Sequence, residues 1–463
     1  MNCEVIVVGG GIGGLTTAAI LAARGMNVWL LERQSRVGGC IANFEKFEYS
    51  FEPTFGLYSG WEPGGTFERI FSELPLAPPV VRRVSPAYVV RLPDGTDVPV
   101  SEDPEQLIDS LRSAFPECVD TSIAFFRAIG RRDRGHESET PIAARLANAS
   151  PRFRQFVDVQ LQTFAQCSGD QCSFSRTAET LAIPTRGMWT IDGGAQALAN
   201  TLAESLKSSG GKSRLDSTAL RLAFGSDGHP TGVDLLTGER IIATRAIISN
   251  LTVWDTYGKL IGLTHTPPAI ARQLKQMHAW GAYLMFLGMD ETACSRLPSD
   301  HMLVVTDWNN DRIYSPEDQQ LSFNSASRID PRAPNGKRAV TVGSFTRAED
   351  WFAFHQNEDE HEQQDQAMLE RCWKRMHSAM PELGDSTEVI ETATPRTLYE
   401  TTRRKFGMVG APSPFSPNQK LEKTVFPNVF LVGDTIAGAV GVEGAVLSAL
   451  SVGDRLLPSR RAL

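Results

Sequence analysis

Residues 3–32 read CEVIVVGGGIGGLTTAAILAARGMNVWLLE, and this stretch decides the fold. Val5 to Val8 is a short apolar run rich in β-branched residues, as expected of a parallel strand that is buried on both faces. Gly9, Gly11 and Gly14 follow as G-x-G-x-x-G, and apolar residues then recur at helical spacing. The order of strand, glycine turn and helix predicts a dinucleotide-binding fold.

Each glycine of the turn has a physical role. Gly9 permits the sharp turn, Gly11 lets the backbone approach a pyrophosphate, and Gly14 lets the helix pack closely on the strand. Asn27 to Leu31 predicts a second strand, and Glu32 follows it about 20 residues after the glycines. A carboxylate there can accept hydrogen bonds from both ribose hydroxyls of an adenosine and repels a 2′-phosphate.

The composition narrows the class of protein. A chain of 463 residues is too long for one ordinary core, so we expect two domains or one large domain with an inserted lobe. The net charge of -8 argues against nucleic acid as a partner, because phosphate binding needs clustered Lys and Arg. No run of about 18 apolar residues is present, so we expect no membrane-spanning helix, while attachment to a membrane surface stays open.

The seven cysteines are scattered and odd in number, which favours a reducing compartment and a cytoplasmic location. The nearest pair, Cys167 and Cys172, has four residues between its members and no histidine-rich neighbourhood. We therefore expect two ordinary thiols and no metal site there.

A second glycine pair makes a resemblance specific. Residues 32–44 read ERQSRVGGCIANF, with Gly38 and Gly39 shortly after the acidic residue. The chain resembles the flavoprotein family of phytoene desaturases, carotenoid isomerases and retinol saturase, with amine oxidases as more distant members. In that family the Gly-Gly loop lies along the pyrophosphate and ribityl chain of FAD. The resemblance implies FAD as the cofactor, and a binding segment formed by Gly9, Gly11, Ile12, Gly13, Gly14, Glu32, Arg33, Gly38, Gly39 and Cys40.

Residues 428–457, NVFLVGDTIAGAVGVEGAVLSALSVGDRLL, carry the second strong motif. They resemble the family's C-terminal FAD block, in which the aspartate binds ribityl hydroxyls and a helix N-terminus faces the flavin pyrimidine ring. Such a helix end stabilises the negative charge that a reduced flavin gains. The implied residues are Gly433, Asp434, Gly441, Val442, Glu443 and Ala445.

Glu443 replaces a proline that desaturases usually carry, and we interpret it as a charge at the helix N-terminus rather than as a base. The C-terminal block contains no cysteine, so we predict FAD held without a covalent bond. No second G-x-G-x-x-G follows a strand, so we expect no separate NADPH-binding domain.

Three further blocks extend the resemblance. Residues 187–198, GMWTIDGGAQAL, resemble a block that returns the chain to the flavin, with Trp189 and Thr190 near the active site. Ile247 to Asn250 resembles a strand end on the adenine side of FAD. Residues 322–337, SFNSASRIDPRAPNGK, are similar to a segment of carotenoid isomerases and desaturases.

The resulting fold class is α/β, with a Rossmann-type FAD-binding domain of the glutathione reductase and amine oxidase kind and an inserted α+β substrate domain. We expect the FAD-binding domain to comprise residues 1–78, 185–265 and 391–463, and the substrate domain to comprise residues 79–184 and 266–390. The substrate domain is predicted to contain a hairpin around Asp94 and Gly95, mostly helical structure from 103 to 186 with a polar interruption at 131–140, four strands of one sheet at 279–289, 301–307, 321–327 and 338–345, and a helix at 360–380.

Three functions fit these observations. The resemblance implies an FAD-dependent desaturase or isomerase that acts on a hydrophobic polyene or isoprenoid, with peripheral membrane contact left open. Departures from the family pattern at Cys40, Thr54, Thr190 and Glu443 keep a second function open, an FAD-dependent oxidase or dehydrogenase of a smaller amine or natural-product intermediate. The third is a flavin-binding protein without chemistry.

The sequence assigns neither a catalytic base nor an oligomeric state. The candidate bases are His278, His301, His355 and His377.

Overall fold

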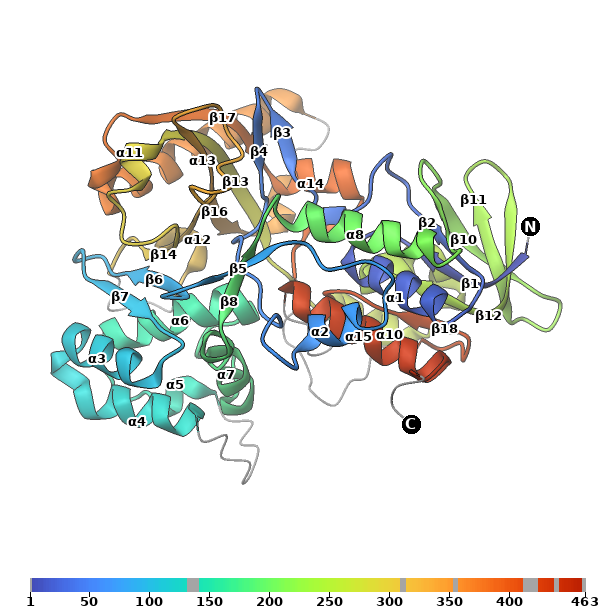
Figure 1. The fold of residues 1–463 in the computed structure, drawn as a ribbon, viewed down its shortest axis with the longest axis horizontal. Helices are drawn as coiled ribbons and strands as arrows, with labels where there is room; N and C mark the ends of the chain where they lie inside the picture. The colour runs from blue at the N-terminus through green and yellow to red at the C-terminus, as the bar shows by residue number, and fades with distance from the viewer. Residues whose placement is uncertain are drawn as a thin grey trace.

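Two seven-stranded sheets organise the chain, one in the right half of Figure 1 and one in the left half. The computed structural model describes residues 2–130, 141–308, 314–352, 357–410, 424–436 and 441–459. The predicted polar interruption at 131–140, the candidate His355 and part of the C-terminal glycine loop lie outside these residues.

The first sheet, which we call the nucleotide sheet, contains the N-terminal strand. Its order is β10 (Ala219–Phe224), β11 (Pro230–Leu235), β12 (Arg240–Ser249), β1 (Asn2–Val8), β2 (Val28–Leu31) and β9 (Lys212–Arg214), and β18 (Val429–Leu431) pairs with β12. Val8 of β1 lies opposite Leu31 of β2 and Ser249 of β12, in parallel pairs. Because parallel strands end at the same edge, the turns after β1, β2, β12 and β18 meet there.

Both faces of β1 are buried, which confirms the reading of its continuous apolar run. Val5 and Val7 pack under α1 (Ile12–Ala23), α8 (Ala195–Ser208) and α15 (Gly441–Leu456). Ile6 and Val8 pack on the other side against residues of α9 (Val253–Asp255) and the π-helix η4 (Thr256–Gly262). The alternation follows from the two-residue period of a strand.

The second sheet, which we call the substrate sheet, has the order β17 (Thr387–Ala393), β13 (Gly281–Asp290), β16 (Lys337–Thr346), β15 (Gln320–Ser325), β14 (His301–Val305), β6 (Tyr88–Arg91) and β7 (Asp97–Val100). Its neighbours pair antiparallel except for β14 and β6. The predicted hairpin and the four predicted strands are therefore confirmed as parts of one sheet.

Helices cover both faces of the substrate sheet. One face carries α3 (Pro104–Ala114), α4 (Val119–Gly130), α5 (Ile142–Arg145), α6 (Pro151–Ala165) and α7 (Phe174–Leu181), at the lower left of Figure 1. The other carries α13 (Glu358–Ala379). Asp103 and Ser150 cap α3 and α6 with their side chains, and each helix begins with proline, so these starts are encoded locally.

The remaining elements lie in the connections between these strands and helices. They are β3 (Phe44–Lys46), β4 (Tyr49–Phe51), β5 (Val81–Val84), β8 (Met188–Ile191), α2 (Thr66–Phe71), α10 (Pro268–Gln276), α11 (Glu291–Cys294), α12 (Pro316–Gln319) and α14 (Pro395–Thr402), with short helices η1 (Gly39–Ile41), η2 (Pro116–Cys118), η3 (Pro184–Arg186), η5 (Leu263–His265), η6 (Ala348–Phe352), η7 (Pro381–Leu383) and η8 (Lys405–Gly407). The boundaries of the five predicted chain segments stay a prediction.

The expectation for one cysteine pair is wrong. Cys167 and Cys172 form a disulfide. The chain leaves α6 through Gln166 in the left-handed conformation and turns back into α7, which brings the two Cα atoms to 5.8 Å. That separation lies in the range that a disulfide spans. The reversal of the chain between α6 and α7 brings the two cysteines together. The number and spacing of cysteines in the sequence do not reveal this proximity.

Candidate functional site

The glycine turn after β1 leaves no room for side chains. A Cβ on Gly14 would lie 2.1 Å from the carbonyl oxygen of Gly9, so only glycine lets α1 begin this close to the strand. Gly11 is the N-cap of α1 and, as a glycine, has no side chain that could accept from the first N–H groups of the helix. The first turn, with Ile12 and Gly13, carries no acidic residue. The first N–H groups of the helix can therefore serve an anion.

The second glycine loop lies directly against the first. The N–H of Gly38 donates to the carbonyl of Gly10 at 2.9 Å, and Gly11 and Gly38 form a bridge pair. A Cβ on Gly39 would lie 3.2 Å from the Cα of Gly11. Two backbone segments thus meet with little side chain between them.

Glu32 ends β2 beside these loops. One carboxylate oxygen accepts from the N–H of Gly10 at 2.6 Å, and the other accepts from the N–H of Gln34 at 2.7 Å. These two bonds fix the carboxylate next to the first glycine turn. The side chain of Arg33 has a partner away from these loops, because its guanidinium donates to the carbonyl of Thr401 at the end of α14.

The C-terminal motif reaches the same edge of the nucleotide sheet. Gly433 and Asp434 follow β18, and a Cβ on Gly13 would lie 3.0 Å from the N of Gly433. The N–H of Gly433 donates to Oγ of Ser448 in α15 at 2.9 Å. Gly441, Val442, Glu443 and Ala445 form the first turns of that helix. The two motifs, more than 400 residues apart in the chain, therefore meet at one edge of the sheet, and we call the place where they meet the cofactor groove.

Asp434 pairs with Arg404 in this groove. The guanidinium lies 2.8 and 3.2 Å from the two carboxylate oxygens, and the N–H of Gly410 donates to the same carboxylate at 3.2 Å. Burial lowers the pKa of Arg404, but the Asp434 carboxylate outweighs burial and the net pKa is raised. Burial also raises the pKa of the nearby Cys40 thiol, against the opposing charge of Arg404. Cys40 is thus a neutral thiol at neutral pH.

Glu443 is held by three partners. Its oxygens accept from Thr66 at 2.9 Å and from Ser59, and Arg186 lies 3.1 and 3.2 Å away. The carboxylate is buried, with an exposed fraction of 7%. Its charge is paired within the protein, which agrees with a helix-end charge rather than a base.

Two residues of the groove lie outside the predicted set of cofactor-binding residues. Asn250 ends β12, and its amide would contact a Cβ on Gly11 at 2.6 Å. The sequence placed Asn250 at a strand end. Arg404 gave no signal, because 30 residues separate it from Asp434 and no local pattern joins them.

A second group of polar side chains, which we call the junction cluster, lies between the nucleotide sheet and the substrate sheet. It consists of Glu52, Tyr58, His301, Asn324 and Arg332. Glu52 is buried, accepts from Tyr58 and from the N–H of Ala195 at 3.0 Å, and pairs with Arg332 at 3.1 Å. Burial and the Glu52 charge raise the pKa of Tyr58 well above its usual value.

The candidate histidines have different surroundings. Nδ1 of His301 lies 3.3 Å from the carbonyl oxygen of Phe55, and burial lowers its pKa to about 4, so the ring is neutral at pH 7. His278 is exposed and lies 3.7 Å from Glu349, and Nδ1 of His377 lies 3.1 Å from the carbonyl of Trp373 in α13. Of these three histidines, His301 is the one that belongs to the junction cluster.

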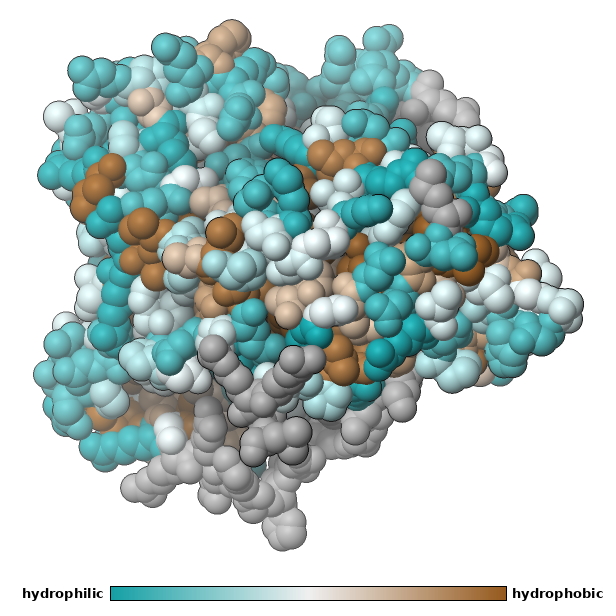
Figure 2. Space-filling view, turned by 45° about the vertical axis from the view of Figure 1, so that its right-hand side comes forward, coloured by the Kyte–Doolittle hydropathy of each residue, from teal (hydrophilic) through white to brown (hydrophobic). Residues whose placement is uncertain are grey.

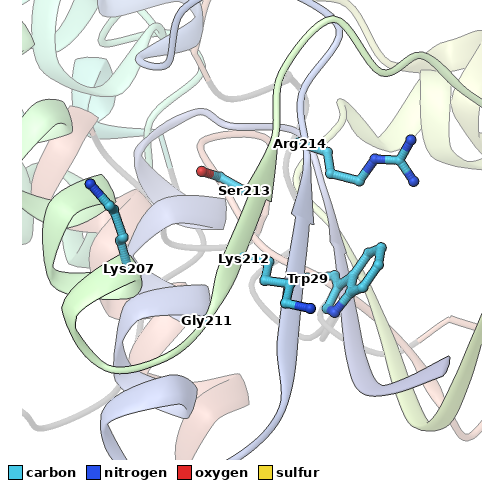
Figure 3. A pocket seen from close by; sticks show the side chains of 6 residues that line it. All are labelled: Trp29, Lys207, Gly211, Lys212, Ser213 and Arg214. Atoms are coloured by element: carbon cyan, nitrogen blue, oxygen red, sulfur yellow. The ribbon is translucent and has the colours of Figure 1, made fainter. Parts of the chain in front are cut away.

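A surface hollow of about 490 Å³ lies beside the edge strand β9 (Figure 3). Trp29, Lys207, Gly211, Lys212, Ser213 and Arg214 line it. The ammonium of Lys212 lies 5.0 Å from the centre of the Trp29 ring, while Arg214 is paired with Glu239 at 2.9 Å. The hollow shares no residue with the cofactor groove, and we assign it no cofactor contact.

The groove suits a dinucleotide. Glycine turns admit a pyrophosphate, the free end of α1 attracts its charge, and Glu32 accepts from ribose hydroxyls. On this fold, such a site is typical of an enzyme that binds a dinucleotide cofactor. The pattern of the family described as "Flavin containing amine oxidoreductase" matches residues 12–457, so the chain belongs to that family and FAD is its cofactor.

Similar proteins cover nearly the whole chain. A prolycopene isomerase from an Oncidium hybrid cultivar is 24% identical, over 98% of this chain and 83% of its own. An all-trans-retinol 13,14-reductase from Danio rerio is 23% identical, over 98% and 86%. The crystal structure of an oxidoreductase from Methanosarcina mazei superposes with a TM-score of 0.70 at 19% identity, over 98% and 99%, which supports the fold.

Proposed function

We propose that this enzyme carries out hydride chemistry at FAD on a long, apolar polyene or isoprenoid chain. The observation that carries the proposal is the similarity to an isomerase of a carotenoid and to a reductase of a retinoid. Each of them matches 98% of this chain, at 24% and 23% identity. Isomerisation, desaturation and saturation of a polyene all remain within the proposal.

We assign the binding of FAD to the cofactor groove. The proposed contacts are Gly9, Gly11, Ile12, Gly13, Gly14, Glu32, Gly38, Gly39, Cys40, Gly433, Asp434, Gly441, Val442, Glu443 and Ala445, with Arg33 at the outer end. Bound FAD supplies the capacity to accept or donate a hydride. The N-terminus of α1 would hold the pyrophosphate, Glu32 would hold the ribose hydroxyls, and Asp434, paired with Arg404, would hold the ribityl hydroxyls.

We also propose that the enzyme takes its substrate from a lipid surface by peripheral contact. No helix among the described residues is long and apolar enough to cross a bilayer. On the face drawn in Figure 2, apolar residues gather in several separate patches among polar ones. Attachment through such patches would suit a substrate that is stored in lipid.

The experiment that tests the function uses the purified protein with its flavin. Heat denaturation should release free FAD into the supernatant, because we expect no covalent bond. The holoenzyme is then mixed anaerobically with phytoene, prolycopene or all-trans-retinol in liposomes. A shifted polyene spectrum supports the proposal, and loss of flavin absorbance separates net oxidation of the substrate from isomerisation. A flavin that no polyene perturbs contradicts it.

The alternative is an FAD-dependent oxidase or dehydrogenase of a smaller amine or natural-product intermediate. The junction cluster favours this alternative, because its polar side chains suit a polar substrate better than a hydrocarbon chain. Consumption of oxygen with soluble amines, and no response to polyenes, would select it.

A further inference from the structure

A small cavity lies inside the junction between the two sheets. Its volume is about 10 Å³, and its lining includes Gly56, Thr190, His301, Asn324, Asp330 and Arg332. A space of this size holds one water-sized group. Gly56, the end of β8, the strands β14 and β15 and the segment 327–332 therefore enclose room for a single oxygen atom and not for an isoprene end.

Asn324 lines this cavity and carries an unpartnered acceptor. Its Nδ2 donates to the carbonyl oxygen of Thr54 at 3.2 Å, and since a carbonyl can only accept, this bond fixes the orientation of the amide. Oδ1 is then the other atom, and it is buried without a hydrogen-bond partner among the described residues. The side chain is 4% exposed. A buried acceptor without a partner costs free energy, which a bound donor would recover.

His301 presents a second acceptor. Its Nδ1 faces the Phe55 carbonyl at 3.3 Å, which places the ring proton on Nδ1 and leaves Nε2 with a lone pair. His301 is buried and lies opposite Asn324 in the β14–β15 register. The two acceptors thus come from paired positions on neighbouring strands.

The charged groups of the lining are already paired. Arg332 lies 3.1 Å from Glu52 and 3.4 Å from Asp330, and Asp330 also accepts from the N–H of Gly193 at 2.7 Å. Asp192 is bonded to Arg82 at 2.7 and 2.8 Å. The lining therefore offers a ligand the acceptor Oδ1 of Asn324 and the Nε–H of Arg332, which has no hydrogen-bond partner among the described residues, with no unpaired charge for a salt bridge.

We propose that this cavity binds the terminal hydroxyl group of the substrate, so that the preferred substrate is an oxygenated polyene rather than a pure hydrocarbon. The hydroxyl hydrogen is donated to Oδ1 of Asn324, and the hydroxyl oxygen occupies the one water-sized space. This inference rests on the proposed function and narrows it to alcohols. It makes Asn324 a residue that determines specificity, without a role in the hydride step.

The test compares three polyenes that differ at one end only. They are all-trans-retinol, the analogue with CH₃ in place of CH₂OH, and the primary amine. Binding to the FAD-loaded protein is measured by quenching of tryptophan fluorescence. We expect retinol to bind about tenfold more tightly than the hydrocarbon, the value of one well-placed hydrogen bond to an otherwise unpaired acceptor.

Two variants separate the acceptor from a structural role. Asn324→Leu removes the acceptor and should bring retinol and the hydrocarbon within twofold of each other. Asn324→Asp also loses the bond to Thr54 but keeps acceptor oxygens, so it should keep a preference for a donor, alcohol or amine, over the hydrocarbon. Ser322→Ala on the same strand lies outside the lining and should keep the tenfold difference. If Asn324→Leu loses FAD, Asn324→Ala, which also removes the acceptor, carries the same expectation.

The outcomes are distinct. Equal binding of alcohol and hydrocarbon to the wild-type protein, or an alcohol preference that survives in Asn324→Leu, overturns the hydroxyl site and leaves the polyene function standing. Tighter binding of the amine than of retinol overturns it in favour of a cationic ligand. If none of the three ligands binds while FAD stays bound, the proposed function itself fails.

Discussion

The cofactor groove and the junction cluster are built from different parts of the chain. The groove is made largely of backbone, with glycines that admit no Cβ and helix ends that offer N–H groups. The junction cluster is made of side chains, and its central pair joins Glu52 to Arg332 across 280 residues. The groove is therefore sensitive to added atoms, whereas the cluster is sensitive to lost charge.

The largest expected effect tests the groove. In Gly14→Val, a Cβ would meet the Gly9 carbonyl oxygen at 2.1 Å, so α1 must move away from β1 and the protein should retain no FAD. The readout is the flavin absorbance of the purified protein. Gly258→Ala is the control, since a Cβ there meets nothing within 4 Å, and it should keep its flavin. Full FAD content in Gly14→Val would disprove this role of the turn.

Removal of the central charge tests the cluster. Glu52→Ala leaves the N–H of Ala195 without its carboxylate and leaves the largely buried guanidinium of Arg332 with Asp330 alone, at 3.4 Å, and should lower the free energy of unfolding by about 3 kcal/mol. Urea unfolding measures the change. For comparison, Lys46→Ala breaks the exposed pair with Glu391 and should cost less than about 1 kcal/mol. Similar costs for the two variants would remove the distinction between the buried and the exposed pair.

The neutral imidazole of His301 makes the junction sensitive to acid. The pKa is near 6.5 in the unfolded chain and about 4 in the folded one. Between these values the unfolded state binds the proton that the folded state excludes, so stability should fall as the pH drops from 6.5 to 4, by up to about 3 kcal/mol.

The pH measurement compares the wild-type protein with His301→Gln, which lacks the titrating group. Burial raises the pKa of Asp158 to about 6, which shifts stability in the opposite sense over much of this range. The difference between the two proteins isolates His301, because Asp158 is common to both. Parallel pH profiles of the two proteins would mean that His301 has the same pKa in the folded and unfolded states, which would contradict the prediction.

The smallest expected effect concerns the ribose end of the groove. Glu32→Gln weakens the acceptor that holds the N–H groups of Gly10 and Gln34, and should raise the Kd of FAD about tenfold. Glu4→Gln, whose exposed carboxylate accepts from the N–H of Asn27 at 2.8 Å, is the matched control and should leave the Kd unchanged. Calorimetric titration of the apoprotein with FAD gives both values.

The sequence predicted what local rules determine. The strand, turn and helix of residues 3–32 depend on glycine sterics and on hydrophobic period, and both are legible in a short window. The four strands of the substrate sheet were legible for the same reason. The Glu52–Arg332 pair, the Arg404–Asp434 pair and the Cys167–Cys172 bond were not, because each depends on how the chain returns in space. Asn324 stood in a recognised segment, but its unpaired oxygen exists only in the folded packing.

The pairing of β18 with β12, and the packing of α15 near Gly433, set an order on synthesis. The first glycine turn is translated more than 400 residues before Gly433 on the opposite wall. A nascent chain can pair β1 with β2 and β12 as soon as β12 has emerged, but it cannot complete the cofactor groove until β18 and the start of α15 have followed. Stable capture of the flavin should therefore follow the translation of β18 and of the start of α15.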